Sequence, residues 1–179
     1  MSPVAVIYVE FYMSLFTFGL VAWRYVIPAM RARPFAEAMV PILLLHSLRH
    51  LGMMYLTPAA VADLPDAGFT VPTAYGDLLT AVLALVALGA LRLDGRIARA
   101  AVWIFNLVGF ADLGLAAVNA QRFQLASHSI GPAYLLPVIV VPALLVTHGL
   151  TFWLLVRRAP AAAPAAGART KAAAAPVAA

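Results

Sequence analysis

The sequence predicts an all-α integral membrane bundle of five transmembrane helices. Hydrophobic residues make up 64% of the 179 residues and charged residues only 11%, against about 45–50% and about 25% in soluble domains. A soluble domain of this size has too little interior to bury so many apolar side chains. The composition therefore excludes a soluble enzyme, a disordered protein and a nucleic-acid-binding protein as descriptions of the whole chain.

Five apolar runs are long enough to cross a bilayer, whose hydrocarbon core takes about 20 residues of helix. The first carries Glu10, and it lacks the basic start and the cleavage site of a signal peptide, so we expect a retained helix. Residues 1–158 form the predicted transmembrane domain, and the Ala- and Pro-rich residues 159–179 a disordered cytoplasmic tail. The five runs cover residues 4–25, 37–56, 72–91, 98–118 and 134–156.

The basic residues alternate between the ends of these runs. Ten of the twelve Lys and Arg residues lie in the first connection, the third connection and the tail. The other two connections hold only Arg122, and Arg49 lies inside a span. The positive-inside rule then puts the N-terminus outside and the C-terminus in the cytoplasm. Ala- and Arg-rich, Lys-poor usage is typical of a GC-rich genome, so we expect a bacterial inner membrane. The dispersed charges form no basic patch for nucleic acid, and the lipid bilayer is the expected partner.

Polar residues inside the spans are the functional signal, because a charge at the centre of a spanning helix costs about 2.5–3.5 kcal/mol on insertion scales. Every span contributes such residues near the middle or in the outer half of the membrane. Three carboxylates against one arginine leave an acidic excess, which favours a site over a structural strut. Arg49, Asp77 and Asp112 are expected to matter most, since unpaired charges cost most. The predicted cluster, connected and facing the bundle interior, is Glu10, His46, Arg49, His50, Asp77, Asn106, Asp112 and His148.

Three histidines suggest a cofactor. His46 and His50 are four residues apart, the spacing at which two imidazoles on one α-helical face can bind one metal ion. With His148 they form a candidate site for copper or zinc. The same residues would instead hold a haem b, with His46 or His50 facing His148 and Arg49 near a propionate. Hydrogen bonding between helices is the alternative role for all three, so the identity of any cofactor stays open.

Several short segments indicate a family. They are the GDL at residues 76–78, the FN at 105–106, Asp112, and the VP and TH that begin and end residues 141–148. Over residues 43–156 the chain resembles an uncharacterised family of small bacterial multi-pass inner-membrane proteins. The resemblance implies a shared bundle and a shared polar site, and it implies no activity.

Three classes of function stay open. Binding or transport of a small solute, proton or metal ion ranks first, because intramembrane ionisable residues mark sites or pathways by default. The second is a structural or partner subunit of a membrane complex, with a homo-oligomer as the other arrangement. The third is a haem- or metal-dependent membrane redox protein, so the ranking favours a non-enzyme. A cavity reaching Arg49 and Asp112 would favour transport, whereas a filled interior with every carboxylate paired would favour the structural role.

Overall fold

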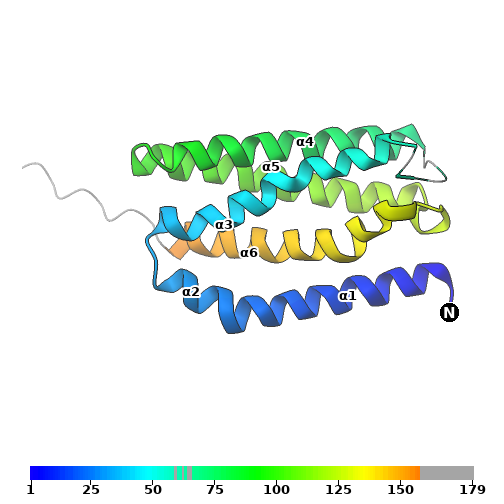
Figure 1. The fold of residues 1–179 in the computed structure, drawn as a ribbon, viewed down its shortest axis with the longest axis horizontal. Coiled ribbons are helices and arrows are strands. Elements are labelled where there is room, and N and C mark those ends of the chain that lie inside the picture. The colour runs from blue at the N-terminus through cyan, green and yellow to red at the C-terminus, as the bar shows by residue number, and fades with distance from the viewer. Residues whose placement is uncertain (59, 62, 64–65, 158–179) are drawn as a thin grey trace, which may run out of the picture.

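The computed structural model describes residues 1–58, 60–61, 63 and 66–157. These residues form five long helices that run back and forth along one axis, and they contain no strand (Figure 1). The prediction of an all-α fold with five long helices is confirmed, and most of the helices extend beyond the apolar runs that predicted them. The predicted tail, residues 159–179, lies outside the described residues. The helices long and apolar enough to cross a membrane are Pro3–Arg31, Phe35–Leu56, Ala67–Ala90, Gly95–Arg122 and Gly131–Arg157.

The first and last of these helices change their winding near prolines. A proline inside a helix has no backbone N–H to donate, and its ring clashes with the carbonyl group four residues earlier. One wider π turn accommodates both effects. One π turn precedes Pro28, and another contains Pro137 and precedes Pro142. The first helix consists of α1 (Pro3–Val21), the π turn Ala22–Val26 and α2 (Ile27–Arg31); the last consists of a 3₁₀ turn (Gly131–Tyr134), the π turn Leu136–Val140 and α6 (Val141–Arg157).

The second helix changes its winding for longer. It begins as α3 (Phe35–Ser47) and continues as a 3₁₀ helix over Leu48–Leu56, which we call the 3₁₀ segment. A 3₁₀ helix has three residues per turn, so residues three apart share one face. Arg49, Gly52 and Tyr55 follow that spacing, and all three are buried. The segment therefore turns one narrow stripe toward the interior.

The middle helices, α4 (Ala67–Ala90) and α5 (Gly95–Arg122), are regular and begin with aspartate caps. The carboxylate of Asp66 accepts from the backbone N–H of Gly68, and that of Asp94 from the N–H of Arg96. Such caps satisfy backbone donors that have no partner within the helix. Helix α4 packs against α3, the 3₁₀ segment and α5.

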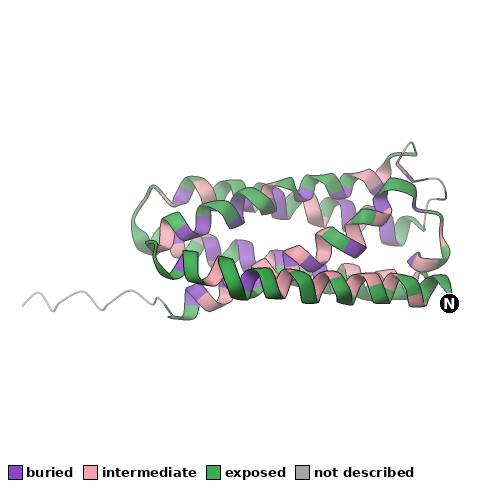
Figure 2. Cartoon of the chain, turned by 60° about the horizontal axis from the view of Figure 1, so that its bottom comes forward, coloured by how far each residue is buried: buried purple, intermediate pink, exposed green. Residues whose placement is uncertain are grey.

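Helix α1 lies at the edge of the bundle. It packs mainly against α6 and the turn that precedes α6, and no residue of Pro3–Val21 is buried. Figure 2 shows the consequence, with the long front helix coloured almost entirely as exposed or intermediate. The other four helices enclose the interior, and α6 separates α1 from α5 (Figure 1).

Two apolar cores leave a polar layer between them. The larger core includes Leu43, Ala84, Phe105 and Leu154, toward the end of the bundle where α6 finishes. The smaller includes Tyr55, Val61, Phe69 and Leu125, at the opposite end. On four helices, buried polar residues, among them His46, Thr80, Asn106 and His148, fall between these two sets in the sequence. The layer therefore crosses the bundle at one level.

Candidate intramembrane polar site

Arg49 is the centre of the site. Its side chain is 1% exposed and enters the bundle from the 3₁₀ segment. Its Nε donates to Oδ1 of Asp77 at 2.7 Å, and its Nη2 to Oδ2 of Asp112 at 2.5 Å. Its Nη1 donates to the carbonyl oxygen of Gly109 at 3.0 Å and lies 3.4 Å from Nε2 of His148. All three guanidinium nitrogens are engaged, as burial of this group requires.

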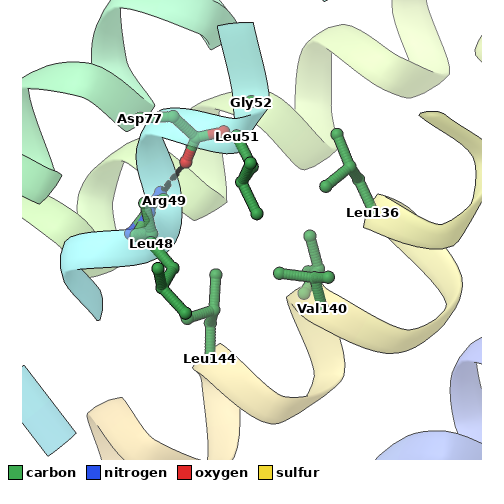
Figure 3. Close-up of a pocket in the computed structure, with 9 residues that line it drawn as sticks. Leu48, Arg49, Leu51, Gly52, Asp77, Leu136, Val140 and Leu144 are labelled. Carbon is green, nitrogen blue, oxygen red and sulfur yellow. Dashed lines mark hydrogen bonds and ion pairs between the residues drawn. The ribbon is translucent and has the colours of Figure 1, made fainter. Parts of the chain in front are cut away.

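The two carboxylates reach Arg49 from different helices. Asp77 lies on α4 and Asp112 on α5. Figure 3 shows the Asp77 carboxylate turned toward the guanidinium of Arg49, which belongs to the 3₁₀ segment. Their side chains are 17% and 11% exposed, so they retain slightly more access than the arginine. One positive group held by two negative groups leaves the ion cluster one negative charge in excess when both carboxylates are ionised.

Two glycines make room for these carboxylates. A Cβ on Gly52 would overlap the carboxylate of Asp77, and a Cβ on Gly76 would overlap that of Asp112. Each glycine therefore permits a close approach of backbone to an acidic side chain. Sequence reasoning missed this role. The sequence offered one indication of this role, namely that each glycine is close to a charged residue of the cluster. Gly52 lies three residues after Arg49, and Gly76 directly precedes Asp77.

His148 extends the network through Asn106. Nδ1 of His148 lies 2.7 Å from Oδ1 of Asn106, and Nδ2 of Asn106 donates to the His148 carbonyl oxygen at 3.4 Å. Arginine can only donate, so the Nε2 that faces Arg49 is the acceptor and Nδ1 carries the hydrogen. The ring also fits closely against Gly109, where an added Cβ would lie 2.8 Å from it. The hydrogen bonds thus assign one neutral tautomer to His148.

His46 joins the layer by contact with His148. The two ring centroids are 4.4 Å apart, and Phe105 packs edge-on against His46 at 5.0 Å. Nε2 of His46 lies 2.9 Å from Oγ1 of Thr147, which itself donates to the carbonyl oxygen of Ala143. The histidine therefore donates to the threonine, and its buried Nδ1 has no hydrogen-bond partner among the described residues. Sequence reasoning missed Thr147, whose signal was its place directly before His148.

Two of the eight predicted residues lie outside this network. Glu10 accepts a hydrogen bond from the hydroxyl of Tyr134, because α1 packs at the edge of the bundle and faces the start of the last helix. His50 is exposed, and its Nδ1 lies 2.9 Å from the carbonyl oxygen of Ser47. The expected pairing of His50 with His46 assumed α-helical winding. The 3₁₀ winding that begins at Leu48 turns the chain by about 120° per residue against about 100° in an α-helix, so His46 and His50 lie about 100° or more apart around the axis.

The histidines do not fit the predicted metal or haem arrangements. Among the described residues no three His, Asp or Glu side chains gather in a way that could hold a metal ion. A haem held by His46 and His148 would need its porphyrin between the two rings. These rings are already in contact at 4.4 Å between centroids, and His50 is exposed. We therefore derive no chemistry through a haem at these residues.

A family model described as a domain of unknown function (DUF8737) covers residues 6–156, which include every residue of the polar network. No curated protein and no solved structure matches the chain. Because the model covers most of the sequence, the chain belongs to the DUF8737 family.

Proposed function

We propose that the protein is a multi-pass protein of a bacterial inner membrane that binds and transports a proton or a small solute. The proposed site is the network of Arg49, Asp77, Asp112, Asn106, His46 and His148. The proposed topology puts the N-terminus outside and the C-terminus in the cytoplasm. The helix ends at Leu56 and Arg122 then face outside, so Arg49 and Asp112 lie in the outer halves of their helices, while Asn106 and His148 lie near the middle of theirs.

The observation that supports this proposal is the charge imbalance around Arg49. One guanidinium faces two carboxylates at 2.7 and 2.5 Å, and its neighbour His148 is held as a neutral acceptor. A net charge in a poorly solvated interior is costly, and a bound proton or cation removes it. Because both aspartates remain slightly exposed, one of them can exchange a proton without the bundle coming apart.

Infrared spectroscopy tests the proton site. We expect the purified wild-type protein to show the C=O band of a protonated carboxylic acid, which disappears when the buffer is made alkaline. The band should also disappear in Asp112→Asn and in Asp77→Asn. Each of these variants leaves Arg49 a single carboxylate, which stays ionised as its counter-charge.

The matched control is Asp94→Asn, which removes the exposed cap of α5 and should keep the band. A wild-type spectrum without the band at any buffer pH would contradict the proposed proton site. A band that survives both the Asp77 and the Asp112 substitution would place the proton elsewhere and would contradict it equally.

Reporter fusions test the proposed topology. Alkaline phosphatase fused after Ser127 should be active, because that connection is expected outside, and the same enzyme fused after Leu93 should be inactive. A fluorescent protein that folds only in the cytoplasm should give the opposite pattern. The reverse result at either position would overturn the orientation and place the polar network toward the cytoplasmic side.

A structural role is the second candidate, because both carboxylates are paired with Arg49. A subunit whose polar layer only joins helices would hold its carboxylates by ion pairs in this way. That function predicts a stable complex with another membrane protein after purification in mild detergent. It also predicts that Asp77→Asn and Asp112→Asn leave transport phenotypes unchanged while the complex dissociates.

A further inference from the structure

A cavity of about 380 Å³ lies beside the network, between the first, second and last helices. Pockets of about 300–1,000 Å³ are typical of small-molecule sites. The lining is apolar except for two side chains, Arg49 and Thr147. Representative lining residues from the three surrounding elements are Phe18, Ala22, Leu45, Ile139, Ala143 and Leu150.

The position of the cavity favours a ligand that arrives from the bilayer. One wall is formed by the inner part of the first helix, and α1 has no buried residue. Nearer the N-terminal end of α1, the hydroxyl of Tyr134 donates to Glu10 and so links α1 to the last helix. In the proposed membrane orientation the cavity lies between spans and near their middle, so hydrocarbon surrounds its open side. An apolar molecule can enter there without crossing water.

A small polar pocket adjoins the cavity. It measures about 30 Å³, room for about one or two water-sized groups, and Arg49, Gly52 and Asp77 form its polar side (Figure 3). Leu51, Leu136, Val140 and Leu144 converge on it from the two facing segments. The pocket and the cavity share lining residues, among them Arg49, Val140 and Leu144. They are therefore neighbouring parts of one space.

The free hydrogen-bonding capacity in the small pocket belongs to an acceptor. The three nitrogens of Arg49 already donate to Asp77, Asp112, Gly109 and His148. Oδ2 of Asp77 receives no hydrogen bond from any described residue. A matching group must therefore donate a hydrogen bond and must be small. A hydroxyl meets both conditions, whereas a phosphate or carboxylate is too large for the small pocket and is repelled by Asp77.

We propose that this space binds a neutral lipophilic alcohol, with its hydrocarbon chain in the cavity and its hydroxyl donating to Oδ2 of Asp77. The proposal rests on the proposed function only in that both use Asp77. The chain contributes affinity through apolar burial, and the hydroxyl selects the ligand. The closeness of the hydroxyl to the ion cluster links ligand binding to the charge state of the two aspartates.

Binding of tritiated farnesol to the full chain in phosphatidylcholine nanodiscs tests the proposal. We expect saturable binding that unlabelled farnesol displaces. Farnesyl phosphate and the saturated hydrocarbon farnesane should compete at least about tenfold less well, the cost of losing one hydrogen bond to a charged group. Ala143→Phe should abolish binding by filling the cavity, and Val140→Phe serves as a second blocking variant in case the first fails to fold. The matched control is Ala117→Phe on the exposed face of α5, which should bind as wild type does.

The outcomes separate this inference from the proposed function. No saturable binding, or binding that persists in a folded Ala143→Phe or Val140→Phe variant, would overturn the ligand site. Equal competition by farnesane would show that the cavity accepts any hydrocarbon, and equal competition by farnesyl phosphate would refute the small neutral head. If the infrared band is absent while farnesol binds as expected, the proton site fails and the ligand site stands.

Discussion

Replacing Arg49 with leucine is expected to lower the free energy of unfolding by about 3–5 kcal/mol, the effect of removing one member of a buried ion pair. Two carboxylates, 17% and 11% exposed, would then face each other without a counter-charge. The carbonyl oxygen of Gly109 would also lose its donor. Thermal or denaturant unfolding in mild detergent, followed by tryptophan fluorescence, measures the change.

The control is Arg92→Leu, because Arg92 is exposed at the end of α4. It should change stability by less than about 1 kcal/mol, since exposed charges contribute little. The triple variant Arg49→Leu, Asp77→Asn and Asp112→Asn should recover much of the loss, because no charge remains unpaired. Equal stability of the wild type and Arg49→Leu would contradict the placement of Arg49 as the single counter-charge.

Replacing Gly76 with alanine is expected to destabilise the protein by about 1–3 kcal/mol, the usual cost of adding atoms to a filled interior. The new Cβ would occupy the position of the Asp112 carboxylate. That carboxylate must then move from Arg49, so the infrared band of the protonated acid should shift as well. Both readouts come from the same purified sample.

Gly89→Ala is the control in the same helix. A Cβ on Gly89 meets nothing within 4 Å, and alanine is the better helix former by about 0.5–1 kcal/mol. The control should therefore be neutral or slightly stabilising. If Gly76→Ala behaved like Gly89→Ala, the carboxylate of Asp112 would not lie against the backbone of α4.

The helices and the ion cluster were predictable because the alternatives are energetically costly. Apolar runs would otherwise be exposed to water, and charged residues inside them would otherwise be unpaired. Apolar runs of about 20 residues have few alternatives to a spanning helix. Inside them, an arginine and two aspartates cannot remain unpaired, so Arg49, Asp77 and Asp112 had to meet. Asn106 and His148 followed from their depth in the same part of the bundle.

The rest depended on winding and on helix order, which residue spacing does not reveal. His50 would share a face with His46 in an α-helix, and the 3₁₀ segment turns it outward. Glu10 has the right depth, yet α1 lies at the edge, so its partner is Tyr134. The role of Gly52 was hidden as well, because it appears only when α4 lies against the 3₁₀ segment.

The 3₁₀ segment also sets how far the second helix reaches. A 3₁₀ helix rises about 2.0 Å per residue against about 1.5 Å for an α-helix, so its nine residues gain about 4–5 Å. The helix has only 22 residues, and the gain gives it nearly one additional turn of length without additional residues. Conversion to α-helical winding would draw Leu56 back by that length and rotate Tyr55 by about 120° relative to Arg49. The same nine residues thus fix both the length of this helix and the direction in which its buried side chains point.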